Sequence, residues 1–126
     1  MAMDTINEGL EKVLGDLKAH PKVIAIYLFG SYAKGCAKPL SDIDIAVIID
    51  EPDPATEAEL GSLYSEKLDV VLFHRLPLYI QFEVFRYGKE LFVRDSDKLF
   101  EIRLSVLRGY LEHSWLYRRM ERDVLK

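Results

Sequence analysis

Apolar residues alternate along the chain between helical spacing and short continuous runs, and this pattern predicts the first three elements. From Asp4 to His20 the apolar residues recur every three or four positions, which is typical of an amphipathic helix. Val23–Phe29 is an almost unbroken apolar run with β-branched and aromatic members, so it is expected to be a strand buried on both faces. Asp42–Asp50 is expected to be a second, central strand, because apolar side chains fall on both of its faces.

The second half of the chain continues the same alternation. The elements expected there are a helix from Pro54 to about Ser65, a strand over Leu68–Phe73, a helix over Leu76–Tyr87, a short strand over Glu90–Arg94, and a long helix from Asp95 or Ser96 to about Val124. This order predicts an α/β (α+β) fold in which helices pack on a small mixed four-stranded sheet. At about 1.5 Å per residue the long helix would span about 40 Å, so its distal end is expected to project from a small domain.

Length and composition narrow the possible functions. The 126 residues are expected to form one domain, with its core at about 5–95 and the C-terminal helix at about 96–124. The net charge of −4 disfavours a protein that grips long nucleic acid by neutralising phosphates. Cys36 is the only cysteine, which excludes an intramolecular disulfide and a multi-cysteine zinc site. Without a signal segment or an apolar stretch near the roughly 18 residues of a membrane span, a cytoplasmic location and no membrane association are expected.

Two aspartates at the start of the second predicted strand indicate where the chemistry lies. Asp42 and Asp44 are separated by one residue, so in a strand their side chains project from the same face. Two such charges about 4 Å apart repel by roughly 4 kcal/mol at an effective dielectric near 20, and a hard divalent cation between them would relieve that repulsion. Asp69, near the start of the third predicted strand, requires the same kind of explanation.

The segment after the first predicted strand has the features of a phosphate site. Gly30 permits a sharp exit from the sheet, and Ser31 is expected to begin a short helix or turn that ends near Cys36. A helix that begins just beyond a strand presents unpaired N–H groups and a positive dipole end to an anion. The spacing of Gly30 and Gly35 resembles the start of a Walker A loop, but the required Lys and Ser or Thr do not follow Gly35.

Taken together, these residues resemble a known family. Gly30-Ser31, ten intervening residues, and then Asp42-Ile43-Asp44 have the spacing of the nucleotidyltransferase superfamily that includes DNA polymerase beta, and Asp69 lies where that family carries a further carboxylate. The short length and the Leu68–Leu72 strand are most similar to the minimal nucleotidyltransferases, or MNT proteins. The resemblance extends from about residue 5 to about residue 95.

The resemblance implies a polymerase beta-like fold and a set of roles. The residues that it assigns to the phosphates of the nucleotide are Gly30, Ser31 and, provisionally, Lys34. The residues that it assigns to two Mg²⁺ ions and to catalysis are Asp42, Asp44 and Asp69. Characterised MNT proteins act as antitoxins that transfer AMP from ATP to a tyrosine of an all-helical HEPN toxin. The resemblance therefore implies ATP as substrate and a HEPN toxin as partner.

Other interpretations of the same residues stay open. Asp42 alone is compatible with a strand end, Ser31 with a helix cap, and Lys34 with a solvated charge. A binding antitoxin that neutralises its partner by occlusion, without catalysis, and a nucleotidyltransferase for a small molecule are the alternative functions. Arg108, four residues and His113 match the spacing of HEPN ribonucleases, but a single helix after an α/β domain makes chance the better explanation.

Aromatic residues in the last predicted helix have two possible roles. Tyr110, Trp115 and Tyr117 either cover the core or, if the end of the helix projects, form a surface for a protein partner together with Arg118 and Arg119.

Overall fold

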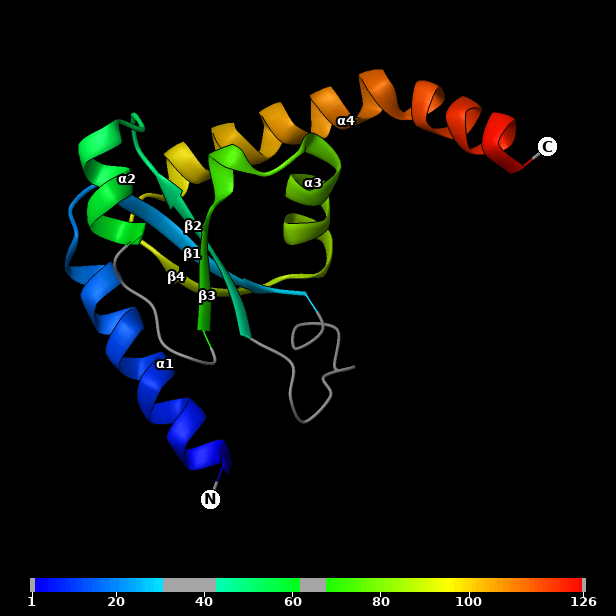
Figure 1. The fold of residues 1–126 in the computed structure, drawn as a ribbon. Helices are drawn as coiled ribbons and strands as arrows, with labels where there is room; N and C mark the ends of the chain where they lie inside the picture. The colour runs from blue at the N-terminus through cyan, green and yellow to red at the C-terminus, as the bar shows by residue number, and fades with distance from the viewer. Residues whose placement is uncertain (1, 31–42, 62–67, 126) are drawn as a thin grey trace.

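The computed structural model describes residues 2–30, 43–61 and 68–125, and these residues form five helical segments and four strands (Figure 1). In chain order the elements are α1 (Ala2–Ala19), β1 (Val23–Phe29), β2 (Ile43–Ile49), α2 (Pro54–Gly61), β3 (Leu68–Leu72), the 3₁₀ helix η1 (Phe73–Arg75), α3 (Leu78–Tyr87), β4 (Lys89–Val93) and α4 (Ser96–Leu125). None of the described helices is long and apolar enough to cross a membrane.

The four strands form one mixed sheet in the order β3-β2-β1-β4. β1 is antiparallel to both β2 and β4, whereas β2 and β3 are parallel because α2 carries the chain back between them. The predicted mixed four-stranded sheet and the central position of the second strand are therefore confirmed.

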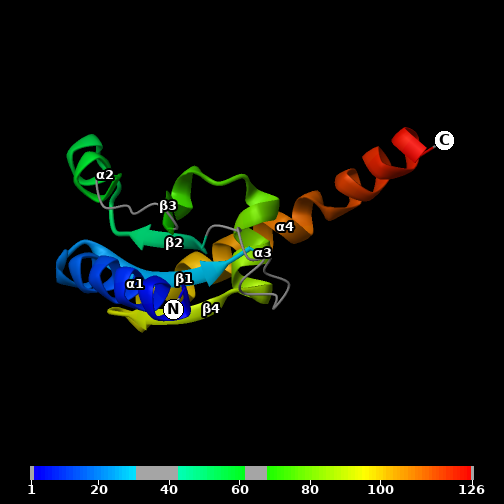
Figure 2. The same ribbon diagram turned by 60° about the horizontal axis from the view of Figure 1, so that its bottom comes forward.

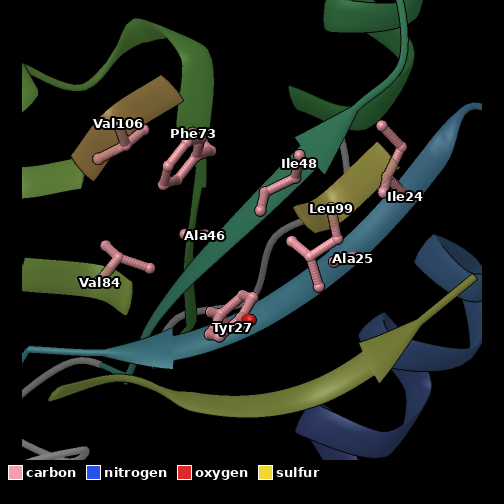
Figure 3. Close-up of a cluster of buried hydrophobic side chains, with 9 residues drawn as sticks. All are labelled: Ile24, Ala25, Tyr27, Ala46, Ile48, Phe73, Val84, Leu99 and Val106. Atoms are coloured by element: carbon pink, nitrogen blue, oxygen red, sulfur yellow. The ribbon is translucent and has the colours of Figure 1, made fainter. Parts of the chain in front are cut away.

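Helices cover both faces of the sheet (Figures 1 and 2). The core on one face joins α1 and α2 to the sheet, and its buried residues are Val13, Leu17, Val23, Ile26, Ile45, Val47, Ile49 and Leu60. The core on the other face joins α3 and α4 to the sheet (Figure 3), and its buried residues are Ile24, Ala25, Tyr27, Ala46, Ile48, Phe73, Val84, Leu99 and Val106. Alternate residues of β2 enter the two cores, as the apolar pattern predicts.

A β-bulge in β1 adjusts this alternation. Val23 pairs with Ile49 and Ala25 pairs with Ile48, so Ile24 is an extra residue on the β1 side. As a result Ile24 and Ala25 both enter the core under α3 and α4, although they are neighbours in the sequence.

Several predicted boundaries are wrong by one or two residues; the strand predicted over Glu90–Arg94, for example, is Lys89–Val93. Proline and side-chain packing explain two of these differences. The helix predicted from Leu76 begins at Leu78, since Pro77 disfavours a helical conformation in the residue before it. Phe73 belongs to the 3₁₀ helix η1 rather than to β3, and its side chain is buried in the core. The predicted start of α2 at Pro54 is confirmed. Asp53 caps this helix, because its side chain accepts a hydrogen bond of 2.7 Å from the backbone N–H of Thr56.

The long C-terminal helix has two parts with different surroundings. Leu99 and Val106 are buried against the sheet, and the Tyr110 ring stacks on Phe82 with centroids 3.8 Å apart. The C-terminal part of α4 projects away from the rest of the fold in both views (Figures 1 and 2). With 30 residues, α4 is about 45 Å long. Tyr110 therefore covers the core, while the side chains of Trp115 and Tyr117 lie outside the described residues.

Candidate active site

Two of the three predicted catalytic aspartates lie side by side at one end of the sheet. Asp44 of β2 pairs with Phe29, the last residue of β1, and it also pairs in parallel register with Asp69 of β3. In-register residues on neighbouring strands project from the same face of a sheet, about 5 Å apart. The strand alternation places both carboxylates on the face that α3 and α4 cover, because the buried residues next to them along the strands, such as Ala46, point into that core.

Gly30 lies directly against the Asp44 carboxylate. Its φ angle is +80°, a left-handed conformation that non-glycine residues rarely adopt. A Cβ atom added to Gly30 would lie 2.5 Å from Oδ2 of Asp44, which is too close for any real contact. The chain therefore needs glycine here for two independent reasons, the conformation of the backbone and the room for the Asp44 carboxylate.

The two carboxylates differ in exposure. Asp44 is half-buried on an inner strand, whereas Asp69 is exposed on the edge strand β3. Two unit charges about 5 Å apart repel by roughly 3 kcal/mol at an effective dielectric near 20. The fold places both charges at this end of the sheet in spite of that cost, which is typical of a site that holds a cation or transfers a proton.

The donor set at this end of the sheet suits Mg²⁺, which prefers oxygen ligands and is usually bound by one or two carboxylates together with water and phosphate. Asp44 and Asp69 provide two carboxylates on one face. In residues 2–30, 43–61 and 68–125, no group of three or more His, Cys, Asp or Glu side chains is arranged to hold a metal ion. The third predicted ligand, Asp42, lies outside the described residues, as do Ser31 and Lys34.

A cluster of charged side chains fixes the turn that follows β3, the strand of Asp69. Glu57 of α2 accepts two hydrogen bonds from Arg75, at 3.0 and 2.6 Å, and it also contacts Nε2 of His74. Hydrogen bonds from Arg75 and then from His74 lower the pKa of Glu57 from 4.5 to about 2. The cluster ties α2 to the turn, so it supports the edge strand at its far end.

A second polar contact lies beneath the site, two residues before Phe29. The hydroxyl of Tyr27 donates a hydrogen bond of 3.1 Å to Glu90 of β4, and the Tyr27 ring meets Phe85 edge-on. Burial, followed by the Glu90 carboxylate, raises the pKa of Tyr27 to about 12. Tyr27 is therefore a neutral hydrogen-bond donor at neutral pH and positions β4 beside β1.

These supporting contacts could not be found from the sequence. Glu57 and Arg75 are 18 positions apart, and Tyr27 and Glu90 are 63 positions apart. No local pattern connects such residues, because the contacts depend on how α2 and β4 pack on the sheet. His113 makes a local contact, because its Nδ1 lies 2.8 Å from the carbonyl oxygen of Gly109 in its own helix.

Comparison with known families gives a match over most of the chain. Residues 11–97 match the family described as "Polymerase beta, Nucleotidyltransferase". The matched range contains all of the predicted site residues, which are Gly30, Ser31, Lys34, Asp42, Asp44 and Asp69.

Two relatives share about a third of their residues with this chain. A protein of Methanocaldococcus jannaschii, named as a candidate protein adenylyltransferase, is 36% identical over 105 residues, which cover 83% of this chain and 75% of that protein. The protein adenylyltransferase MntA of Shewanella oneidensis is 32% identical over 117 residues, which cover 87% of this chain and 83% of that protein.

Two solved structures have the same fold. A toxin-antitoxin crystal structure with AMP-PNP superposes with a TM-score of 0.70 and 30% identity, covering 94% of this chain and 98% of the other. A tri-AMPylated HEPN toxin of Shewanella oneidensis in complex with MNT antitoxin gives a TM-score of 0.65 and 27% identity, with full coverage of both chains.

Proposed function

Since the chain belongs to the polymerase beta nucleotidyltransferase family and is similar to protein adenylyltransferases within it, we propose that it transfers AMP from ATP to a tyrosine hydroxyl of a HEPN-domain partner. The observation that carries the proposal is the row formed by Gly30, Asp44 and Asp69 at one end of the sheet. Phosphoryl-type transfer requires chiefly that the reacting groups are positioned and that their charge is neutralised. A row of two carboxylates beside a glycine turn can position the reacting groups, and divalent cations held by these carboxylates would neutralise the phosphates.

The difference in exposure suggests how the two substrates approach. Asp69 is exposed on the edge strand, so a hydroxyl of another protein reaches it from outside the sheet. Asp44 is half-buried beside Gly30, where the backbone without a Cβ lets a phosphate come close. We therefore assign the acceptor to the Asp69 side and the triphosphate to the Gly30 and Asp44 side.

The bond changes follow from this placement. The acceptor oxygen attacks the α-phosphorus of ATP, the bond from that phosphorus to the bridging oxygen breaks, and pyrophosphate leaves. The hydroxyl proton passes to Asp69, the exposed carboxylate on the acceptor side. Ser31 and Lys34 are proposed to hold the phosphates, because Ser31 follows Gly30 directly and Lys34 supplies a positive charge.

Asp42, Asp44 and Asp69 are proposed to hold two Mg²⁺ ions. When bound, these ions would neutralise the triphosphate and favour the deprotonated acceptor. The carboxylates of this chain orient both substrates and keep them in line for displacement.

The proposed partner follows from the relatives. The MNT protein that this chain resembles over its full length is found with a HEPN toxin that carries AMP groups. We accordingly propose that this chain is an antitoxin that acts in the cytoplasm as a single domain over residues 1–126. A lone cysteine is consistent with a reducing compartment.

The test is to incubate the chain with Mg²⁺, ATP and the proposed HEPN-domain partner, and to measure the mass of that partner. One or more AMP-sized increases are expected, and they should map to tyrosine. The double substitution Asp42→Asn with Asp44→Asn should abolish the increase without changing the circular dichroism spectrum. An unchanged mass with the unmodified chain would refute the proposal.

The same double variant separates transfer from simple occlusion. If AMP transfer is needed, co-expression of the double variant with the toxin partner should fail to restore the growth of the cells. Full neutralisation by the double variant would instead assign the chain as a binding antitoxin.

A further inference from the structure

A stripe of apolar side chains on α4 is left uncovered by the fold. Phe100, Leu104 and Leu107 are separated by four and then three residues, the spacing of a helix-packing seam. Phe100 is 65% exposed and Leu107 is 43% exposed, whereas Leu99 and Val106 beside them are buried in the core. The helix therefore has two apolar sides, one packed on the sheet and one facing solvent.

The apolar stripe forms one wall of a groove of about 980 Å³. The opposite wall comes from α3, where Phe82 and Phe85 line the groove, and Val93 of β4 contributes from one side. A groove of this size with apolar walls matches the mode in which an amphipathic helix lies in a cleft and anchors residues at every third or fourth position.

The charged residues that line the groove favour an acidic occupant. They are Arg86, Arg103 and Glu90, and Glu90 already accepts the hydrogen bond from Tyr27. The Arg103 guanidinium lies 5.5 Å from the centre of the Phe85 ring, which holds it in place at the groove. Arg86 is exposed on α3, so the groove has two positive charges and one negative charge in its lining although the chain has a net charge of −4.

The groove also lies close to the candidate active site. Glu90 pairs with Tyr27 in the sheet, and Tyr27 precedes Gly30 by three residues, or about 10 Å along a strand. Tyr27 and the two carboxylates lie on the same face of the sheet. The groove therefore approaches the Gly30 side of the candidate site along β4, the edge strand opposite to the one that carries Asp69.

From these observations we propose that the groove between α3 and α4 binds a helix of the HEPN-domain partner whose apolar stripe is flanked by Asp or Glu side chains. The proposal rests on the proposed function for the identity of the partner, since similar chains are found in toxin-antitoxin complexes. The position and chemistry of the surface follow from this structure alone.

The test measures the affinity of the full chain for the proposed HEPN-domain partner by isothermal titration calorimetry. Phe100→Asp with Leu107→Asp should weaken binding by about 30-fold or more, because exposed apolar anchors at the centre of an interface carry most of its energy. Tyr79→Asp is the matched control: Tyr79 is 51% exposed on α3 but does not line the groove, so affinity should stay within about twofold.

A charge variant tests the acidic flanks without touching the apolar stripe. Arg86→Glu should slow association and weaken its dependence on salt, because this exposed arginine lines the groove and contributes to electrostatic steering of an acidic helix. Faster association of this variant would overturn the proposed acidic flanks.

Two results would overturn the docking proposal, and both are separable from the catalytic one. The first is unchanged affinity of the Phe100→Asp/Leu107→Asp variant. The second is a dimer of the chain alone that this variant converts to a monomer, which would make a second copy the occupant. By contrast, unmodified chain that binds its partner in the groove but adds no AMP would refute the proposed function and leave the docking surface standing. Retained binding by the Asp42→Asn/Asp44→Asn variant would support the docking surface.

Discussion

The negatively charged side chains at the two ends of β2 have different surroundings. Beyond its last residue, Asp50 contacts Lys98 of α4 and Asp53 contacts Lys22, so each carboxylate has a cationic neighbour. Near its first residue, Asp44 lies in register with a second carboxylate, that of Asp69. The first arrangement stabilises the fold through opposite charges, whereas the second places like charges side by side where we propose that a metal ion and a nucleotide bind.

The largest effect is expected from identical substitutions at the two ends. Asp44→Asn should lower the rate of AMP transfer about 10³-fold, because it removes a carboxylate from the proposed site. Asp50→Asn should leave transfer within about twofold and lower the melting temperature by about 1–3 °C, because Lys98 loses its partner. Transfer is measured by AMP incorporation, and melting by circular dichroism.

Equal losses of transfer in the two variants would contradict this comparison. They would mean that AMP transfer does not depend on Asp44 more than on Asp50.

A smaller effect is expected when a methyl group is added to Gly30, beside the Asp44 carboxylate. Gly30→Ala places a Cβ against the Asp44 carboxylate in a backbone conformation that costs roughly 1–2 kcal/mol for a non-glycine residue. Transfer should fall about tenfold or more, since small displacements of a positioned group are costly. Gly15→Ala in α1 is the control: its Cβ would meet nothing within 4 Å, so the free energy of unfolding should rise by up to about 1 kcal/mol.

If Gly30→Ala lowered stability but left transfer unchanged, the contact with Asp44 would be structural only. The two measurements therefore separate strain in the turn from displacement of the carboxylate.

The smallest effect concerns pH and the paired charges around α2. The pKa of Glu57 is about 2 in the folded protein and near 4.5 when unfolded, so the stability from its contacts is present above pH 4.5 and is lost as the pH falls towards 2. The melting temperature of the unmodified chain should fall between pH 6 and pH 3. Glu57→Gln should start lower at pH 7 and fall less steeply, with a remaining fall from Asp53, whose pKa is also about 2.

Parallel melting curves for the two proteins over this pH range would show that the bonds from Arg75 and His74 to Glu57 do not contribute to stability. Added salt should reduce the difference at pH 7, because these side chains reach the surface.

Much of the fold could be predicted because the spacing of apolar residues along a segment indicates which of its faces are buried. β1 spans Val23–Phe29, as its apolar run predicts, and the alternation along β2 correctly assigns residues to the two cores. The errors arise where a single residue overrides the pattern, as Pro77 does at the start of α3. The sequence also indicated Asp44 and Asp69 as candidate site residues, through their positions near the starts of two predicted strands and the spacing from Gly30, and their roles stay a prediction.

The sequence by itself determined which segments form helices and strands with apolar faces, and which carboxylates are candidate site residues, because residue type and spacing carry that information. Only the tertiary structure decided that Asp44 and Asp69 share one row, that Gly30 makes room for a carboxylate oxygen, and that the Phe100 side of α4 stays exposed. Strand register and helix packing are collective properties of residues far apart in the chain, so no local pattern encodes them.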